Sequence, residues 1–326
     1  MATLTAGFTY SDRIRPLLDG RVEVPGYTLD IRCLDAQTLF RQTLQEGPFD
    51  VSELSMASHI VTTSRNASAF VGIPAFLSRA FRHGCVYVRT DRGIAAPGDL
   101  KGSRVGLVEY QQTAALWMRG VLADEHGVAP QSISWVTGGL TRPQLTDRIA
   151  VALPPEIRVE RSPRSLDDLL RAGDIDAVIA PTPPPCVQDP SVPVRRLFGD
   201  HHEAEIAWHR RTGFFPIMHT AVVRRGLAES DPLLPGALFR AFAAAKRLAF
   251  QDLEAGTPAV MLPWTSWHVA QTREILGRKY WSYGVSGNAD ELAAMCRYAH
   301  ADGLSPRALD ATELFWPATC GLVDAA

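Results

Sequence analysis

Strand-like and helix-like segments alternate over the first two thirds of this 326-residue chain, and this order predicts an α/β fold. The first set of expected elements consists, in order, of strand, helix, strand, helix, strand and helix: Leu4–Thr9, Asp12–Leu18, Tyr27–Leu34, Ala36–Glu46, Phe49–Leu54 and a helix ending near Ser64. Gly47 is expected to close the second helix, and Ser55 or Ser58 to cap the third.

A glycine-containing break divides the chain after this first set. The segment Asp91–Gly106 holds three Gly before a new strand and a fourth inside it, and a second α/β set follows. Its expected elements are Arg104–Val108, Thr113–His126, Ile133–Thr137, Leu166–Ala172, Ala177–Ala180 and a long strand at 214–224. The remainder is expected to be helical over Pro232–Ala255, Ser266–Leu276 and Ala289–Ala301.

Composition excludes several classes of function. The chain is 46% hydrophobic and 21% charged with a formal net charge of −2, so it lacks the basic excess of a nucleic-acid-binding protein. No apolar run approaches the roughly 18 residues needed to span a bilayer. The N-terminus does not read as a secretory signal, and the five Cys are scattered without a CxxC pair. We therefore expect a cytoplasmic protein with no membrane or nucleic-acid partner; the alternative is a chain whose signal peptide is missing.

Two Arg and one His lie close together just before an expected strand that starts near Cys85. In Gly72–His83, Arg79 and Arg82 offer planar donor forks that match a carboxylate, and His83 can move a proton near neutral pH. The segment is thus a candidate carboxylate-binding edge. A solvated basic loop is the alternative.

A second His-containing pattern concerns metal binding. His201, Glu205 and His209 recur every four residues of a helical-looking segment, a spacing that can hold a divalent metal. Because the segment is highly polar, we interpret it as a solvated helix face and expect no metal site.

The phrase Asp99-Leu-Lys-Gly-Ser-Arg-Val-Gly106 resembles the opening of the second lobe in type II periplasmic-binding-protein folds. The resemblance implies two lobes, 1–88 with 218–326 and 89–217, a helical C-terminal part, and a ligand in the cleft between the lobes. It also implies two crossover strands, Val86–Thr90 and Ile217–Val223.

Longer phrases resemble the 4,5-dihydroxyphthalate decarboxylase family. They occur in the family's order at 50–55, 72–83, 87–93, 109–114 and 211–220. The resemblance implies a cofactor-independent aromatic acid decarboxylase, a carboxy-lyase that converts 4,5-dihydroxyphthalate to 3,4-dihydroxybenzoate and CO2. The phenolic proton is removed, the ring carbon bearing the carboxylate is protonated, and CO2 leaves; the protein supplies a base, an acid, carboxylate anchors and a dry cleft.

Four residues are candidates for proton transfer. His219 is the first choice because it lies in a crossover strand, and His83 is the second. Glu53, at the carboxyl end of a strand, can orient a His or accept a catechol proton, and Glu109 occupies the corresponding place in the second lobe. The alternatives are satisfied core histidines and buried structural carboxylates.

Substrate binding is assigned to residues that flank these positions. Arg79 and Arg82 are the expected carboxylate anchors, and a helix start supplies further anion-binding groups. The other candidates are Tyr110, Gln111 and Thr113 at that helix start, then Ser11, Arg13, Thr182, Thr220, Trp264 and His268. Ordinary capping and packing are the alternatives for these residues.

Two other functions remain open at this point. One is a non-catalytic binding protein that delivers an aromatic acid to a transporter. The other is a related lyase acting on a different hydroxylated aromatic acid in a biosynthetic pathway. The expected partner is in each case a small aromatic carboxylate.

Overall fold

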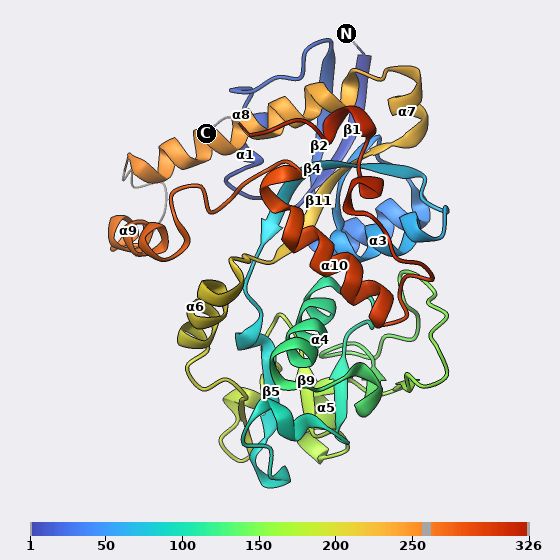
Figure 1. The fold of residues 1–326 in the computed structure, drawn as a ribbon, viewed down its shortest axis with the longest axis vertical. Helices are drawn as coiled ribbons and strands as arrows, with labels where there is room; N and C mark the ends of the chain where they lie inside the picture. The colour runs from blue at the N-terminus through green and yellow to red at the C-terminus, as the bar shows by residue number, and fades with distance from the viewer. Residues whose placement is uncertain (1, 256–261, 325–326) are drawn as a thin grey trace. The chain divides into compact units, whose positions relative to one another are not determined.

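The structure, a computed structural model, describes residues 2–255 and 262–324. The chain forms two compact units, each built from separate stretches of sequence. Unit 1 comprises 1–79, 217–293 and 310–326, and unit 2 comprises 80–216 and 294–309. In Figure 1, unit 1 contains the blue N-terminal strands and the orange α8 (Leu234–Glu254), whereas unit 2 contains the green α4 (Thr113–His126). The lobe limits expected from the sequence stay a prediction. They assign 80–88 and 294–309 to the first lobe and residue 217 to the second, whereas the compact units place 80–88 and 294–309 in unit 2 and residue 217 in unit 1.

Unit 1 is built on a five-stranded mixed sheet with the order β2-β1-β3-β11-β4. The strands are β1 (Ala2–Phe8), β2 (Tyr27–Cys33), β3 (Val51–Ser55), β4 (Phe70–Arg79) and β11 (Ile217–Arg224). β1 pairs in parallel with both β2 and β3, and β11 runs antiparallel between β3 and β4. The sheet therefore joins the N-terminal α/β set to a strand that lies more than 130 residues later in the sequence.

The helices of unit 1 begin and end at sequence signals. The Ser55 side chain accepts a hydrogen bond from the N–H of Ser58, which caps α3 (Met56–Ser64) as predicted, and Ser58 lies inside the helix. α2 (Ala36–Arg41) continues through a wider turn to Glu46, where Gly47 ends it in a left-handed conformation with φ 62°. All five residues of β3 are buried, although Ser52, Glu53 and Ser55 are polar.

β4 is an element that the sequence pattern does not predict. Gly72 and Pro74 interrupt its apolar pattern, so no strand is predicted over Phe70–Arg79. Pro lacks an N–H, so it is tolerated only at edge strands or bulges. β4 is the edge strand of its sheet, and its register with β11 shifts between His219 and Ala221. Both features accommodate Pro74.

Both predicted crossover strands lie inside the sheet of a single unit and need correction. Ile217–Val223 falls in β11, which pairs with β3 and β4 in unit 1. Val86–Thr90 contains β5 (Val86–Arg89), which lies inside the sheet of unit 2, because it pairs there with two neighbouring strands. The chain instead passes from unit 1 to unit 2 after Arg79 and returns before Ile217, where β11 starts. Within unit 2, the Ala80 N–H donates to the Pro216 C=O at 3.0 Å, which joins the two passages.

Unit 2 has a six-stranded sheet with the order β10-β5-β9-β6-β7-β8. The further strands are β6 (Arg104–Leu107), β7 (Ser134–Thr137), β8 (Val159–Arg161), β9 (Ala177–Ile179) and β10 (Val194–Arg196). β6 pairs in parallel with β7 and β9, as expected for α/β units. α5 (Leu166–Ala172) packs its Leu166, Leu169 and Leu170 into the core of this unit.

Helices predominate after β11, as predicted. They are α7 (Arg225–Ser230), which the sequence analysis missed, then α8, α9 (Thr265–Leu276) and α10 (Ala289–Ala301). Short helical segments elsewhere are α1 (Arg15–Leu18) and α6 (His201–Thr212). Within the described part of the chain, no helix combines the length and the apolar character that a membrane crossing requires.

Candidate active site

Glu53 and His219 come from neighbouring strands and meet on one face of the unit 1 sheet. Glu53 in β3 is directly opposite Ala221 in β11, and His219 lies two residues before Ala221. Since side chains alternate along a strand, Ala221 and His219 share a face with Glu53. The His219 Nδ1 lies 2.6 Å from the Glu53 Oε1, so the pairing of β3 with β11 creates the contact between two residues that were predicted separately.

The second oxygen of Glu53 is bound by Thr9, which follows β1. The Thr9 backbone N–H donates to Oε2 at 2.9 Å and the Thr9 hydroxyl donates to the same atom at 2.6 Å. Both carboxylate oxygens therefore have partners although Glu53 is fully buried. This satisfies the rule that a buried charge needs compensating hydrogen bonds.

Hydrogen bonding decides the charge of Glu53. Burial alone would raise its pKa, but the hydrogen bonds from His219 and Thr9 and the attraction of His219 outweigh it, so the pKa of Glu53 is lowered and it remains a carboxylate. A carboxylate only accepts hydrogen bonds, so the His219 Nδ1 carries a proton and Nε2 is the nitrogen left for chemistry. Among the described residues, none forms a hydrogen bond with that Nε2.

His219 is held in place but stays reachable. The ring of Phe40 in α2 meets it edge to face, with ring centroids 4.7 Å apart. The His219 side chain is 18% exposed, whereas the Glu53 side chain is 0% exposed. A small molecule can thus reach the imidazole edge, while the carboxylate behind it is inaccessible. The pair has the geometry of a base with an orienting acid.

Other residues predicted in unit 1 have varied surroundings. The Arg13 guanidinium lies over the Trp281 ring at 4.2 Å, donates from Nε to the Leu77 C=O at 3.1 Å and pairs with Asp12 at 2.6 Å. The Ser11 C=O accepts the N–H groups that start the following turn. Arg13 keeps 19% of its side chain exposed, so it retains some access to an anion.

Thr220, Trp264 and His268 differ from His219 in exposure. The Thr220 hydroxyl is fully buried and donates to the Ile73 C=O at 2.7 Å, which favours the packing alternative. Trp264 is 70% exposed before α9, and His268 is exposed within that helix. Their substrate-binding roles stay predictions.

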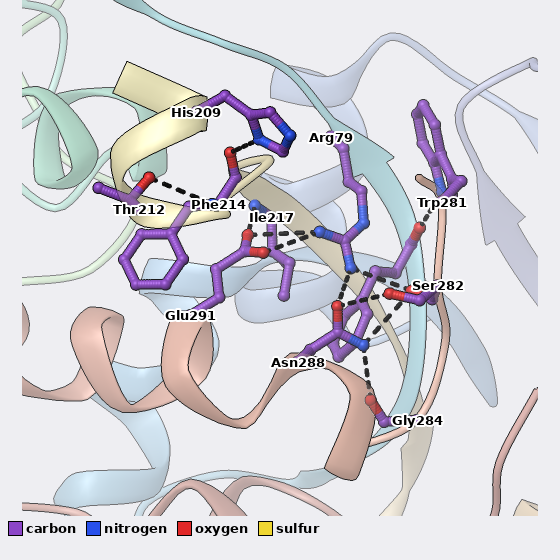
Figure 2. A network of polar contacts seen from close by, with 11 residues as sticks. Arg79, His209, Thr212, Phe214, Ile217, Trp281, Ser282, Gly284, Asn288 and Glu291 are labelled. Atoms are coloured by element: carbon purple, nitrogen blue, oxygen red, sulfur yellow. Dashed lines mark hydrogen bonds and ion pairs between the residues drawn. The ribbon is translucent and has the colours of Figure 1, made fainter. Parts of the chain in front are cut away.

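Arg79 lies at the centre of a polar network inside unit 1 (Figure 2). Its guanidinium pairs with Glu291 at 3.0 Å, and it also donates to the Ser282 C=O at 3.0 Å and to the Asn288 side chain. The Glu291 carboxylate accepts the Ile217 N–H at 2.6 Å. The Arg79 side chain is 1% exposed, so these contacts favour a structural role at the start of β11 over substrate anchoring.

In unit 2, Glu109 is bound by a loop that the sequence analysis did not connect to it. Arg148 donates its backbone N–H to the Glu109 Oε1 at 2.9 Å and its Nε to Oε2 at 2.6 Å, and Gln144 adds a bond at 3.2 Å. Glu109 is 3% exposed. This ion pair compensates its charge, so a buried structural carboxylate describes it better than a free general base.

The start of α4 holds the other predicted residues of unit 2. Gln111 is fully buried, and neither side-chain amide atom has a hydrogen-bond partner among the described residues. The Tyr110 ring packs against the Arg119 guanidinium at 3.9 Å, and burial raises the pKa of Tyr110 above its ordinary value. Thr113 is buried at the first helical position. An orphaned amide beside a helix N-terminus is consistent with the predicted anion site.

His83 is packed in an aromatic cluster of unit 2. Its ring lies 5.1 Å from Phe198 and 5.5 Å from Trp208, and burial, with nearby His126 and Arg211, lowers its pKa to about 4. His83 is therefore neutral at physiological pH, which favours the structural alternative. Arg82, half-buried beside it, lies 3.9 Å from the Cys85 Sγ.

Neither the segment around Thr182 nor α6 adds a binding cluster. Thr182 is exposed. His201, Glu205 and His209 do lie in one helix, α6, but the His209 Nδ1 contacts the Phe214 C=O and Glu205 accepts the Gly84 N–H. In residues 2–255 and 262–324, no group of three His, Cys, Asp or Glu is arranged to hold a metal ion.

Three residues that shape these sites were not predicted from the sequence, namely Thr9, Phe40 and Arg148. Thr9 carried a weak signal, since polar side chains after parallel strands gather at one edge of a sheet. Phe40 and Arg148 had no such signal in the sequence. Phe40 lies 179 residues from its partner His219, and Arg148 lies 39 residues from its partner Glu109.

Comparison with solved structures defines the fold. The alkanesulfonate-binding protein SsuA of Xanthomonas axonopodis pv. citri covers 97% of this chain and 98% of its own, with a TM-score of 0.55 and 14% identity. The aliphatic sulphonate-binding protein SsuA of Escherichia coli gives a TM-score of 0.53 at 14% identity, over 99% of this chain and 100% of its own. The protein therefore has a periplasmic-binding-protein-like fold, as predicted. At these identities the likeness extends to the fold alone.

Comparison with characterised sequences defines the family. The chain is 40% identical to 4,5-dihydroxyphthalate decarboxylase of Comamonas testosteroni over 311 residues, which is 94% of each protein. It is 37% identical to the enzyme of the same name from Pseudomonas putida over 204 residues, 62% of this chain and 79% of that one. No family model matches the chain. The chain is a member of a family of carboxy-lyases on a binding-protein-like fold. That family is the 4,5-dihydroxyphthalate decarboxylases, as the sequence motifs predicted.

Proposed function

We propose that this protein decarboxylates 4,5-dihydroxyphthalate to 3,4-dihydroxybenzoate and CO2. The relative from Comamonas testosteroni, which carries that activity in its name, supports the reaction. The observation that carries the mechanism is the Glu53–His219 pair, a buried carboxylate 2.6 Å from a partly exposed imidazole.

The substrate itself supplies the electronic route. Direct loss of CO2 would leave an aryl anion in the plane of the ring, with no π system to stabilise it. In 4,5-dihydroxyphthalate each carboxylate has a hydroxyl para to it, so removal of that phenolic proton raises the electron density at the carbon that bears the carboxylate. Protonation of this carbon by a proton drawn from the solvent gives a dienone. Loss of CO2 returns the bonding electron pair to the ring as a phenolate, which takes back the proton held by the base. The ring is the electron sink, so the route needs no electron-accepting cofactor.

In this proposal His219 removes the phenolic proton through Nε2. Glu53 is a positioning residue, since it touches the imidazole and not the substrate. Its carboxylate fixes the proton on Nδ1 and stabilises the imidazolium that forms, and Thr9 fixes the carboxylate in turn. Positioned proton transfer of this kind contributes about 10²- to 10⁴-fold to a rate.

Carboxylate anchoring beside His219 is proposed for Arg13, which lies in the same unit and keeps 19% of its side chain exposed although it also pairs with Asp12. Arg82 and Gln111 belong to unit 2, and their anchoring roles stay predictions. The Arg79 contacts argue against including it. The anchors should hold the retained carboxylate, because tight binding of the departing one would stabilise the ground state as well.

The experiment is incubation of metal-stripped protein with 4,5-dihydroxyphthalate, with CO2 and product followed by mass spectrometry. Turnover to 3,4-dihydroxybenzoate supports the proposal. Tight binding without turnover would instead support a solute-binding protein, and turnover of only another hydroxylated aromatic acid would support a related lyase. A cytoplasmic location is part of the proposal and is tested by fractionation of the producing cells.

A further inference from the structure

A cavity of about 550 Å³ lies in unit 1 and shares no lining residue with the Glu53–His219 pair. Its walls come from α3, the start of β4, the start of α7 and the segment 312–320. Volumes of 300–1,000 Å³ are typical of small-molecule sites. The proposed decarboxylation makes no use of this space.

The cavity lies at the opposite end of β11 from His219. Within that strand, His219 pairs with Ser55 and Ser78, whereas Arg224 pairs with Phe70. His219 and Arg224 are five residue steps apart along the strand, which corresponds to about 17 Å at 3.3 Å per residue. The cavity takes its lining from the Phe70 end, so a ligand there does not occupy the imidazole edge of His219.

His59 gives the cavity a polar group that lacks a partner. Its Nε2 lies 2.6 Å from the Leu314 C=O, and a carbonyl only accepts, so Nε2 carries the proton. Burial is the main cause that lowers the pKa of His59 to about 4, so the ring is neutral and Nδ1 has a free lone pair. That Nδ1 is buried and has no hydrogen-bond partner among the described residues. Because Nδ1 is buried, a ligand reaches it only when the groups that cover it move aside, and the ligand group that satisfies it must donate, as a hydroxyl does.

Arg225 and two aromatic residues provide the remaining recognition chemistry. Arg225 is exposed, donates from Nε to the Ser68 C=O at 3.4 Å, and has no carboxylate within 4 Å in the part of the chain that the structure describes. Phe70 and Trp316 line the same cavity. A guanidinium fork recognises a carboxylate, and aromatic walls accept a planar ring.

Glu313 limits the charge of a ligand. It also lines the cavity, and its carboxylate accepts the Asp310 N–H at 2.9 Å. With one cation and one anion among the lining residues, a ligand with a single carboxylate is matched, whereas a second carboxylate would meet a like charge.

We propose that this cavity is a second binding site for a hydroxylated aromatic acid with one carboxylate. The carboxylate binds Arg225, the ring packs against Phe70 and Trp316, and a hydroxyl donates to the His59 Nδ1. This ligand class includes the product of the proposed decarboxylation. A role in sensing product rests on the proposed function, whereas binding itself does not.

Cys320 offers a local readout of occupancy. It lines the cavity, is partly exposed, and lies 3.7 Å from the C=O groups of Thr312 and Trp316. Burial raises the pKa of its thiol, so alkylation by iodoacetamide is measured at mildly alkaline pH. Cys33, exposed and close enough to Glu53 to feel its charge, reports the other end of the sheet in the same sample. Peptide mass spectrometry follows the two alkylation rates separately.

The test compares 3,4-dihydroxybenzoate, benzoate and phthalate in the wild-type chain, His219→Ala, Arg225→Gln and Thr63→Trp. We expect 3,4-dihydroxybenzoate to slow Cys320 alkylation several-fold in the wild type and equally in His219→Ala. Benzoate, which lacks both hydroxyls, should protect less, and phthalate, which lacks them too and carries a second carboxylate, should protect less than benzoate. Arg225→Gln should raise the half-protecting concentration roughly 10- to 100-fold, as loss of one charge-assisted bond implies. Thr63→Trp, which fills the cavity from α3, should abolish protection.

Three results would overturn the proposal. They are protection of Cys33 without Cys320, unchanged protection in Arg225→Gln, and equal protection by phthalate. Because Cys320 labelling is a binding readout that His219→Ala leaves intact, this test can fail while decarboxylation is confirmed, and it can succeed in a protein that has no turnover.

Discussion

Thr9 binds the same carboxylate as His219, from the opposite side. The two hydrogen bonds from Thr9 end on the Glu53 Oε2, and the imidazole contacts Oε1. Three strands that neighbour one another in the unit 1 sheet, β1, β3 and β11, therefore fix one buried charge. The orientation of His219 depends on a hydroxyl that does not touch it.

Thr9→Val tests this dependence. The valine keeps the backbone N–H bond to Glu53 and the side-chain volume but removes the hydroxyl, so the carboxylate is held less firmly. We expect kcat to fall roughly tenfold while KM changes little, because the loss of one neutral-to-charged hydrogen bond is worth about 1.5 kcal/mol. Thr9→Ser, which retains the hydroxyl, is the matched control and should recover most of the rate. Equal rates for the Val and Ser variants would remove Thr9 from the mechanism.

Arg79→Lys should act on stability. Lys retains the charge but cannot serve Glu291, Asn288 and the Ser282 C=O together, since it lacks the planar fork. We expect the free energy of unfolding to fall by about 2–3 kcal/mol, with KM for the substrate nearly unchanged.

Arg82→Lys is the comparison for Arg79→Lys, because Arg82 is partly exposed. It should leave stability within about 0.5 kcal/mol of the wild type. Chemical denaturation and steady-state kinetics measure both quantities. A stable Arg79→Lys protein with a strongly raised KM would return Arg79 to the substrate site.

The C-terminal segment approaches β4 closely at Gly72, which forms an isolated parallel bridge with Phe315. The Trp316 N–H donates to the Gly72 C=O at 2.9 Å, and a Cβ on Gly72 would clash with the Leu314 carbonyl oxygen and lie 2.8 Å from the His59 Nε2. Gly72→Ala should therefore displace 312–316 and increase amide exchange there by at least tenfold. Gly226→Ala is the control in the same unit, since nothing lies within 4 Å of the added methyl. Unchanged exchange in Gly72→Ala would refute this packing.

Buried neutral histidines should make stability depend on pH. The pKa of His59 and of His83 is lowered to about 4 in the folded protein, against an ordinary value of 6.5, mainly by burial. Between these values the unfolded chain binds more protons, so the unfolding free energy falls as pH drops from about 6.5 to 4, by at most about 3 kcal/mol per ring.

Denaturation midpoints at several pH values from 7 to 4.5 measure this effect. Gln does not titrate, so His59→Gln combined with His83→Gln should flatten the dependence. If the double variant loses stability as steeply as the wild type, other groups control the acid sensitivity.

The sequence predicted the fold better than it predicted the site. The strand and helix patterns identified most elements of both units, because burial periodicity is a local property. The strand β4 was not predicted, because Gly72 and Pro74 interrupt its pattern. Pro74 is accommodated because β4 is an edge strand with a register shift, and the edge position depends on the whole sheet.

Site residues were predicted one at a time, without their partners. His219 and Glu53 were identified separately, but their contact follows from the register of β3 with β11, across 166 residues of chain. Conversely, Glu109 was predicted to transfer protons and Arg79 to bind a carboxylate, because their ion-pair partners come from distant segments. Arg148 pairs with Glu109, and Glu291 pairs with Arg79. Partners that neutralise a charge at long range leave no local signature.

The central claim is that His219 takes part in a decarboxylation that protonates the ring. Its most direct test is a reaction with 4,5-dihydroxyphthalate in D2O, with the wild-type chain and His219→Ala compared by mass spectrometry and NMR. We predict one CO2 per 3,4-dihydroxybenzoate, and one deuterium at the ring carbon that carried the departing carboxylate. The rate should fall about 10²- to 10⁴-fold in His219→Ala while the folded state is retained. A folded His219→Ala protein that releases CO2 at the wild-type rate would contradict the account.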